Sequence, residues 1–135
     1  MDEKELKERT KKTARMLFHS WKSEVGYDFW KKFDPALARE LSMFYTGVLY
    51  SREVLSQKQR ELCALAALTA LHRPNEVRAH IHAALNVGAT RREVAEVIFQ
   101  MATYGGMPVV VDALEVYGKV LAERGEPFPG EDATA

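Results

Sequence analysis

The chain has 135 residues, and Lys plus Arg equals Asp plus Glu at 19 each, so its formal net charge is zero. That balance argues against nucleic acid as a partner, because neutralising phosphates needs a basic surplus on one face. The longest apolar stretch, Leu62–Leu71, is far shorter than the ~20 residues of a membrane span. No apolar signal region follows the charged N-terminus. A lone cysteine, Cys63, cannot form an intramolecular disulfide. We therefore expect a cytoplasmic protein that binds neither nucleic acid nor membrane.

Start and stop signals predict an all-α, single-domain bundle of about six helices spanning residues 1–135. The first helix is expected from about Glu3 to Glu24, and the aromatic segment Tyr27–Phe33 follows it. Asp34-Pro35 is typical of a helix N-cap followed by proline in the first turn, and predicts a helix to about Tyr50. Residues 1–33 thus precede a core at 34–124, and 125–135 is expected to be a flexible tail.

A capping box, Ser56-x-x-Gln59, predicts the start of the most apolar helix, which we expect from Gln57 to about His72. This helix has almost no polar face. A small chain can surround few of its own helices, so such a helix favours burial against another subunit. We therefore expect a homo-oligomer.

Three further helices are predicted by the same kinds of signal. Pro74 lies in the first turn of a helix, Asn75 to Val87, that Gly88 ends with a left-handed cap. A second capping box, Thr90-x-x-Glu93, opens the next helix, which Gly105-Gly106 ends. The last helix begins at Pro108 and runs to about Glu123, before Gly125. The predicted inner face of the second of these helices is Val94, Val97, Ile98 and Met101.

The best candidate for chemistry is the pair Glu76 and His80, which lie one turn apart on the same face of one predicted helix. A carboxylate beside an imidazole can fix its tautomer and favour its protonated form, which makes a general acid or base. Arg73 extends that line toward the preceding helix. The apolar stripe through Val77 and Ile81 is rotated by about 100° from it, so the pair borders the buried face.

Other interpretations of these polar residues stay open. A Glu/His pair at this spacing is also common on solvated helices. His82 points to nearly the opposite side from His80, so the two are not a helical metal pair, and we expect no metal ion. Cys63 in its apolar run is expected to be buried and inert. Glu61, near the start of its predicted helix, is interpreted either as a first-turn acid favoured by the helix dipole or as a side chain that reaches a cleft.

From about Phe44 to Leu121 the sequence resembles the carboxymuconolactone decarboxylase family. The family pattern runs from an aromatic-Ser-Arg turn through Leu-Gly-Arg, Glu-Leu-Arg and His to Asn-Gly-x-Thr and Tyr-x-Gly-x-Pro. The matching pieces, in order, are YSREVL (50–55), LHRPNEVRAH (71–80), AALNVGATRREVAEVI (83–98) and YGGMP (104–108).

This resemblance implies an alkylhydroperoxidase D-like helical fold that assembles as a hexamer, a trimer of dimers, with active sites that need no cofactor. It implies decarboxylation of a small carboxymuconolactone-like acid in aromatic catabolism. His80, oriented by Glu76, would deliver the proton, and arginines would hold substrate carboxylates. Four further residues fall on family positions and are candidate substrate ligands: Arg52, Arg73, Arg78 and Tyr104.

The sequence departs from the family pattern at Glu53-Val54 after Arg52, at His72 in place of glycine, at Val87, and at Val109–Val111. A non-catalytic or ligand-binding oligomer of the same fold is therefore the alternative. Peroxidase activity of the alkylhydroperoxidase D type is disfavoured, because its two cysteines would fall at Arg73 and Glu76. Glu61 matches the position of that sister family's proton-relay glutamate.

Overall fold

The structure is a computed structural model that describes residues 1–21 and 26–132. The regular elements in these two ranges are all helical, which confirms the predicted all-α fold. The chain divides into two compact units, Met1–Ser56 and Gln57–Ala135. Whether the chain forms a single domain stays a prediction. None of the helices in the described ranges is long and apolar enough to cross a bilayer.

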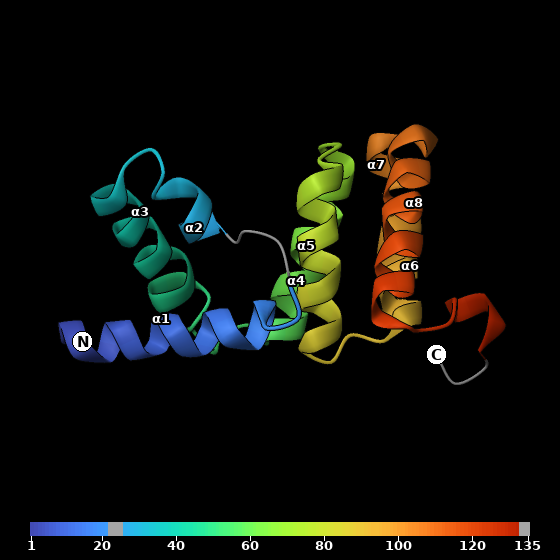
Figure 1. Cartoon of the computed structure of the whole chain (residues 1–135). Coiled ribbons are helices and arrows are strands. Elements are labelled where there is room, and N and C mark those ends of the chain that lie inside the picture. The colour runs from blue at the N-terminus through green and yellow to red at the C-terminus, as the bar shows by residue number, and fades with distance from the viewer. Residues whose placement is uncertain (22–25, 133–135) are drawn as a thin grey trace. The chain divides into compact units, whose positions relative to one another are not determined.

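The first unit contains three α-helices and a π-helical segment: α1 (Glu3–Phe18), α2 (Gly26–Trp30), α3 (Pro35–Ser42) and η1 (Met43–Leu49) (Figure 1). η1 packs against α1 and α3, and α2 packs against α3. Gly47 lies against α1, because a Cβ there would lie 2.3 Å from the hydroxyl oxygen of Thr10. A larger residue at this position would have to displace the Thr10 and Leu6 side chains, so glycine allows η1 to pack tightly on α1.

In the first unit the predicted helices are present, but their lengths differ from the prediction. Asp34 caps α3 as predicted, accepting the Leu37 amide at 3.0 Å. The single helix expected up to Tyr50 instead changes to π-helical geometry after Ser42. The aromatic segment contains the short helix α2, which the sequence analysis missed. α1 ends at Phe18, and its predicted end, Glu24, lies outside the described residues.

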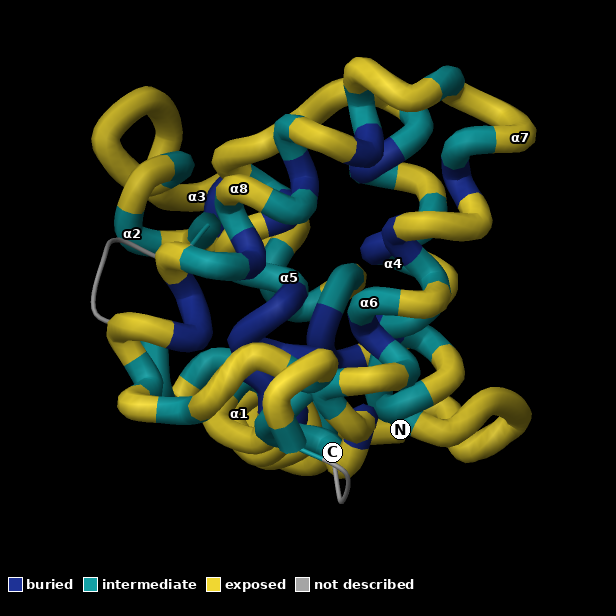
Figure 2. The backbone as a smooth tube through the Cα atoms, turned by 90° about the vertical axis from the view of Figure 1, so that its right-hand side faces the viewer, coloured by how far each residue is buried: buried dark blue, intermediate teal, exposed yellow. Residues whose placement is uncertain are grey.

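The second unit is a bundle in which α4, α5, α6 and α8 pack on one another (Figure 1). Its elements are α4 (Gln57–Ala70), α5 (Pro74–Asn86), α6 (Arg91–Gln100), α7 (Ala102–Gly105), α8 (Met107–Arg124) and the 3-10 segment η2 (Pro129–Glu131). Buried positions recur along the bundle helices and alternate with exposed ones, as the colours in Figure 2 show. The centre of the core includes Leu65, Ile81, Val94, Ile98 and Val110.

Local start and stop signals in the second unit hold. The capping box at Thr90 and Glu93 is present, with both hydrogen bonds at 3.0 Å. Gly88 has a φ of +101°, as its predicted capping role requires. The helix expected up to Gly105 ends earlier, at Gln100, and α7 forms a separate short turn. The capping box at Ser56, like the oligomeric assembly, stays a prediction.

The segment after α8 folds back on α6. The Arg91 guanidinium donates to the Pro127 carbonyl at 2.8 Å and pairs with Asp132 at 2.6 Å. η2 packs against α6. The tail predicted to be flexible therefore has specific partners as far as Asp132, and its last residues, 133–135, lie outside the described ranges.

Candidate active site on α4 and α5

The candidate site lies where α4 and α5 pack side by side in the second unit. Pro74 occupies the first turn of α5, as predicted, and sets where the helical register begins. In that register Val77 and Ile81 are buried in the core, and His80 lies beside them. On α4 the buried positions are Glu61, Leu65 and Thr69, one turn apart from each other. One buried carboxylate therefore lies on an otherwise mainly apolar helix face.

That carboxylate is the hydrogen-bond partner of His80. The Nδ1 atom of His80 lies 2.6 Å from Oε2 of Glu61. The Glu61 side chain is 0% exposed and the His80 side chain 16% exposed. Since a carboxylate only accepts, the ring donates its Nδ1–H to Glu61. The contact fixes the imidazole's orientation and places its second nitrogen, Nε2, on the side away from Glu61.

The second oxygen of Glu61, Oε1, is buried and has no hydrogen-bond partner among the described residues. A buried acceptor without a donor costs roughly 1–3 kcal/mol, and more when it is charged. Most buried polar groups in folded proteins are satisfied, so an exception asks for a functional explanation. The Glu61 carboxylate therefore has the capacity to accept one further N–H or O–H while it still holds His80.

Glu76, which the sequence analysis assigned to orient His80, has a different partner. Its carboxylate accepts a hydrogen bond from the Arg73 guanidinium at 2.9 Å. This contact with Arg73, more than the charge of His80, lowers the pKa of Glu76 below its ordinary value of 4.5. The same contact raises the pKa of Arg73. The assignment is corrected: the carboxylate hydrogen-bonded to His80 is Glu61, on the neighbouring helix.

Of the four candidate substrate ligands, Arg73, Arg78 and Tyr104 belong to the second unit, and their described environments differ. Arg73 is the N-cap residue of α5, immediately before the helix that carries His80, and its side chain is exposed. Arg78 points to the side of α5 opposite His80 and forms an ion pair with Glu123 on α8. Tyr104 is on α7 with 72% of its surface exposed. Arg52 belongs to the first unit, in the turn after η1.

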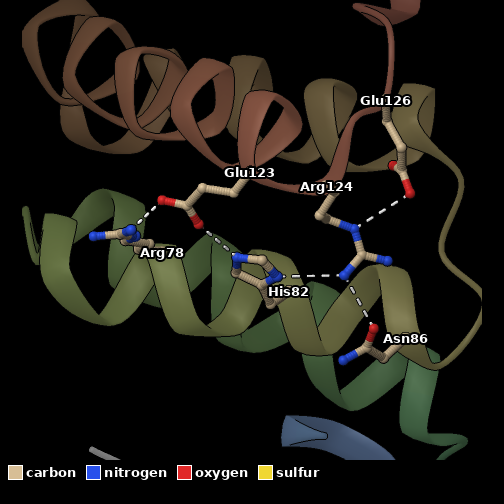
Figure 3. A network of polar contacts seen from close by, with 6 residues as sticks. All are labelled: Arg78, His82, Asn86, Glu123, Arg124 and Glu126. Carbon is tan, nitrogen blue, oxygen red and sulfur yellow. Dashed lines mark hydrogen bonds and ion pairs between the residues drawn. The ribbon is translucent and has the colours of Figure 1, made fainter. Parts of the chain in front are cut away.

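A second polar network joins α5 to α8, and the sequence analysis did not anticipate it (Figure 3). The His82 ring is buried, with Nε2 at 3.0 Å from Glu123 and Nδ1 at 3.3 Å from Arg124. We call this network the α5–α8 clamp; its members are Arg78, His82, Asn86, Glu123, Arg124 and Glu126. A possible signal was the spacing of Arg78, His82 and Asn86, which recur every turn on one face.

Of two further side chains, the first departs from its prediction. Cys63 was predicted to be buried, but it is exposed, because α4 turns this part of its apolar surface outward. His72 has a φ of +56° and pairs with Asp112 on α8. A left-handed backbone favours glycine, which explains the family's glycine at this position. Within the described ranges, no three His, Cys, Asp or Glu side chains are grouped to hold a metal ion.

Comparison with known proteins places this chain in a family. The family model described as the carboxymuconolactone decarboxylase family matches residues 35–118, which include Glu61 and His80. An uncharacterised 15.0 kDa protein from the nqo9–nqo10 intergenic region of Paracoccus denitrificans is 38% identical over 99 residues, covering 71% of this chain and 73% of that protein.

Two relatives carry the names of enzymes. A 4-carboxymuconolactone decarboxylase of Acinetobacter baylyi is 34% identical over 85 residues, covering 63% of each chain. The nitrosuccinic acid decarboxylase npaB of Metarhizium robertsii is 30% identical over 83 residues, covering 59% of this chain and 58% of its own. The match thus spans less than two thirds of either decarboxylase. Because the family model matches more than half of the sequence, this chain belongs to the carboxymuconolactone decarboxylase family.

Proposed function

We propose that this protein is a cofactor-independent decarboxylase of a small, carboxymuconolactone-like organic acid. The observation that carries the proposal is the buried hydrogen bond between Glu61 and His80. Membership of the family and the two relatives named as decarboxylases support a carboxy-lyase at the family level. The two relatives are named for different acids. We base the proposed substrate on the relative with the higher identity, the 4-carboxymuconolactone decarboxylase.

The reaction needs two events, loss of carbon dioxide and then protonation of the carbanion. His80 and Glu61 are suited to the protonation. The bond between the carboxylate carbon and its neighbour breaks, carbon dioxide leaves, and the electron pair delocalises into the conjugated acyl system. One proton must then reach the resulting carbanion, so the balance is substrate carboxylate plus one proton giving product plus carbon dioxide. His80 in its protonated form supplies that proton from Nε2 and is recharged from solvent.

Glu61 supports this step through its position. While Oε2 holds Nδ1–H, the carboxylate stabilises the imidazolium that exists before proton transfer and keeps Nε2 pointing away from α4. Because Glu61 is fully buried, its attraction for the imidazolium is weakly screened by solvent. The unpartnered Oε1 gives the carboxylate room for one more donor, either from the substrate or from water.

Arg73 is the candidate that best fits a substrate carboxylate in this arrangement. It is exposed, lies at the N-terminal end of the helix that carries His80, and has a guanidinium that can bind a carboxylate with two parallel hydrogen bonds. Glu76 holds it in the described structure. Arg52 and Tyr104 stay candidate ligands on the basis of family position alone.

The test is a decarboxylation assay with 4-carboxymuconolactone, measured as carbon dioxide release in normal and deuterated water. We expect turnover by the wild type, with one solvent deuterium in the product, and a loss of roughly 10²–10⁴-fold in kcat for His80→Gln. His19→Gln, at an exposed histidine that ends α1, is the matched control and should keep full activity. Absence of wild-type turnover would favour a non-catalytic oligomer or another substrate, and unchanged activity in His80→Gln would remove the proton-donor role.

A further inference from the structure

α5 bears two histidines that serve different neighbours. His80 and His82 are two positions apart, so their side chains point about 200° away from each other around the helix axis. His80 contacts Glu61 on α4, whereas His82 contacts Glu123 and Arg124 on α8. The α5–α8 clamp therefore binds the same helix that carries the proposed proton donor (Figure 3).

We propose that the α5–α8 clamp holds His80 in register with Glu61, an inference that rests on the proposed function. The clamp requires His82 to be the neutral tautomer that carries its proton on Nε2. The chemistry of its partners fixes this tautomer. A guanidinium has only N–H donors, so Arg124 requires Nδ1 of His82 to accept. The Glu123 carboxylate only accepts, so Nε2 must donate.

The clamp spans the stretch of α5 that contains His80. The three clamp residues of α5 lie on successive turns. Arg78 pairs with Glu123, and His82 contacts both Glu123 and Arg124. Asn86 accepts a hydrogen bond from Arg124. The span of these three residues along the axis is about 12 Å. Anchors on three turns resist both sliding and rotation of the helix, whereas apolar contacts such as that of Ile81 have little directional preference.

This geometry matters because the contact on the other side of α5 is short. A shift of about 1 Å would turn the 2.6 Å separation between His80 and Glu61 into one at the limit of a hydrogen bond. Displacements of that size from changes away from the reacting atoms can lower a rate by about 100-fold. The clamp also gives Arg78 a role different from substrate binding, because the Arg78 guanidinium holds Glu123.

Steady-state kinetics of clamp variants provide the first test. His82→Leu removes both ring contacts, and we expect kcat to fall roughly 10- to 100-fold with a smaller change in KM, because His82 is not among the proposed substrate ligands. His82→Gln retains one donor and one acceptor and should recover part of kcat. Glu123→Gln should also lower kcat, whereas Glu115→Gln, an exposed carboxylate on the same helix, serves as the matched control and should not.

Long-range ¹H–¹⁵N spectra of the histidine rings provide a second test that needs no turnover. In the wild type at neutral pH we expect His82 to carry its proton on Nε2 and His80 to carry a hydrogen-bonded proton on Nδ1. In His82→Leu, or in Glu123→Gln if the leucine variant fails to fold, the His80 signal should shift or broaden.

The two tests separate the clamp from the decarboxylase proposal. A His82 proton on Nδ1, or an unchanged His80 signal in folded clamp variants, would overturn the positioning role whether or not the protein turns over substrate. Wild-type protein without decarboxylase activity but with the expected ring spectra would refute only the proposed function.

Discussion

The two histidine–carboxylate contacts of α5 differ in how completely the carboxylate is satisfied. Glu123 is 36% exposed, and both of its oxygens are engaged, one by Arg78 and one by His82. Glu61 is 0% exposed, and only one of its oxygens has a partner among the described residues. The same pair of residue types therefore forms a saturated network on one side of the helix and an unsaturated one on the other.

This difference indicates which contact stabilises and which is available for chemistry. In the saturated network each carboxylate oxygen already accepts a hydrogen bond from a fixed side chain, so these contacts hold α5 against α8. An unsatisfied buried carboxylate lowers stability, and proteins keep such groups mainly where function uses them. The comparison makes Glu61, rather than Glu76, the carboxylate whose loss should matter most for catalysis.

The largest effect is expected on activity, from a comparison of the two candidate carboxylates. Glu61→Gln should lower kcat by roughly 10²–10³-fold, because an amide cannot stabilise the His80 imidazolium by charge. Glu76→Gln should change kcat by only a fewfold, because Glu76 contacts Arg73 instead. The measurement is the steady-state rate of decarboxylation by both variants, compared after each has been shown to be folded. A greater loss in Glu76→Gln than in Glu61→Gln would restore the sequence-based assignment.

The next effect concerns stability, and it compares the two histidines. His80→Leu leaves Glu61 as a buried charge without its donor, and should lower the free energy of unfolding by about 3–5 kcal/mol. His82→Leu leaves Glu123 with Arg78 and partial exposure to solvent, so it should cost only about 1–2 kcal/mol. Urea denaturation gives both values.

A double variant provides the control for this stability comparison. When Glu61 and His80 are both replaced by leucine, no charge stays buried, and stability should return close to that of the wild type or exceed it. If the double variant were as unstable as His80→Leu, the loss would come from packing rather than from the isolated carboxylate.

The local elements of the fold were predictable from the sequence, because each signal acts within one turn. Asp34 with Pro35, and Thr90 with Glu93, determine helix starts through their own backbone contacts. Pro74 likewise determines where α5 begins, and with it the register that places His80 beside the core.

The partners of these residues could not be predicted, because they depend on how helices pack. Spacing along α5 pairs His80 with Glu76, whereas the register between α4 and α5 brings Glu61 to the ring. The exposure of Cys63 and the pairing of Arg78 with Glu123 depend in the same way on tertiary contacts. Its place near a helix start and its match to a sister family's position made Glu61 a candidate, but neither feature indicated His80 as its partner.

The smallest expected effect is the pH dependence of the clamp. Hydrogen bonds from His82, and then from Arg78, hold the pKa of Glu123 below its ordinary value of 4.5. The folded chain thus binds the Glu123 proton less tightly than the unfolded chain does. The stabilisation from Glu123 is complete above the ordinary pKa and disappears as pH falls through the lower, folded value.

Replacement of this carboxylate by its amide should reveal that dependence. Glu123→Gln should be less stable than the wild type near neutral pH, and the difference should shrink between about pH 5 and about pH 3 as the wild-type carboxylate is protonated. Unfolding free energies across that range measure the difference, with Glu115→Gln as the reference for loss of an exposed charge on α8. A difference that stayed constant with pH would mean that Glu123 contributes through packing, and the contrast between a saturated and an unsaturated carboxylate on α5 would lose its electrostatic basis.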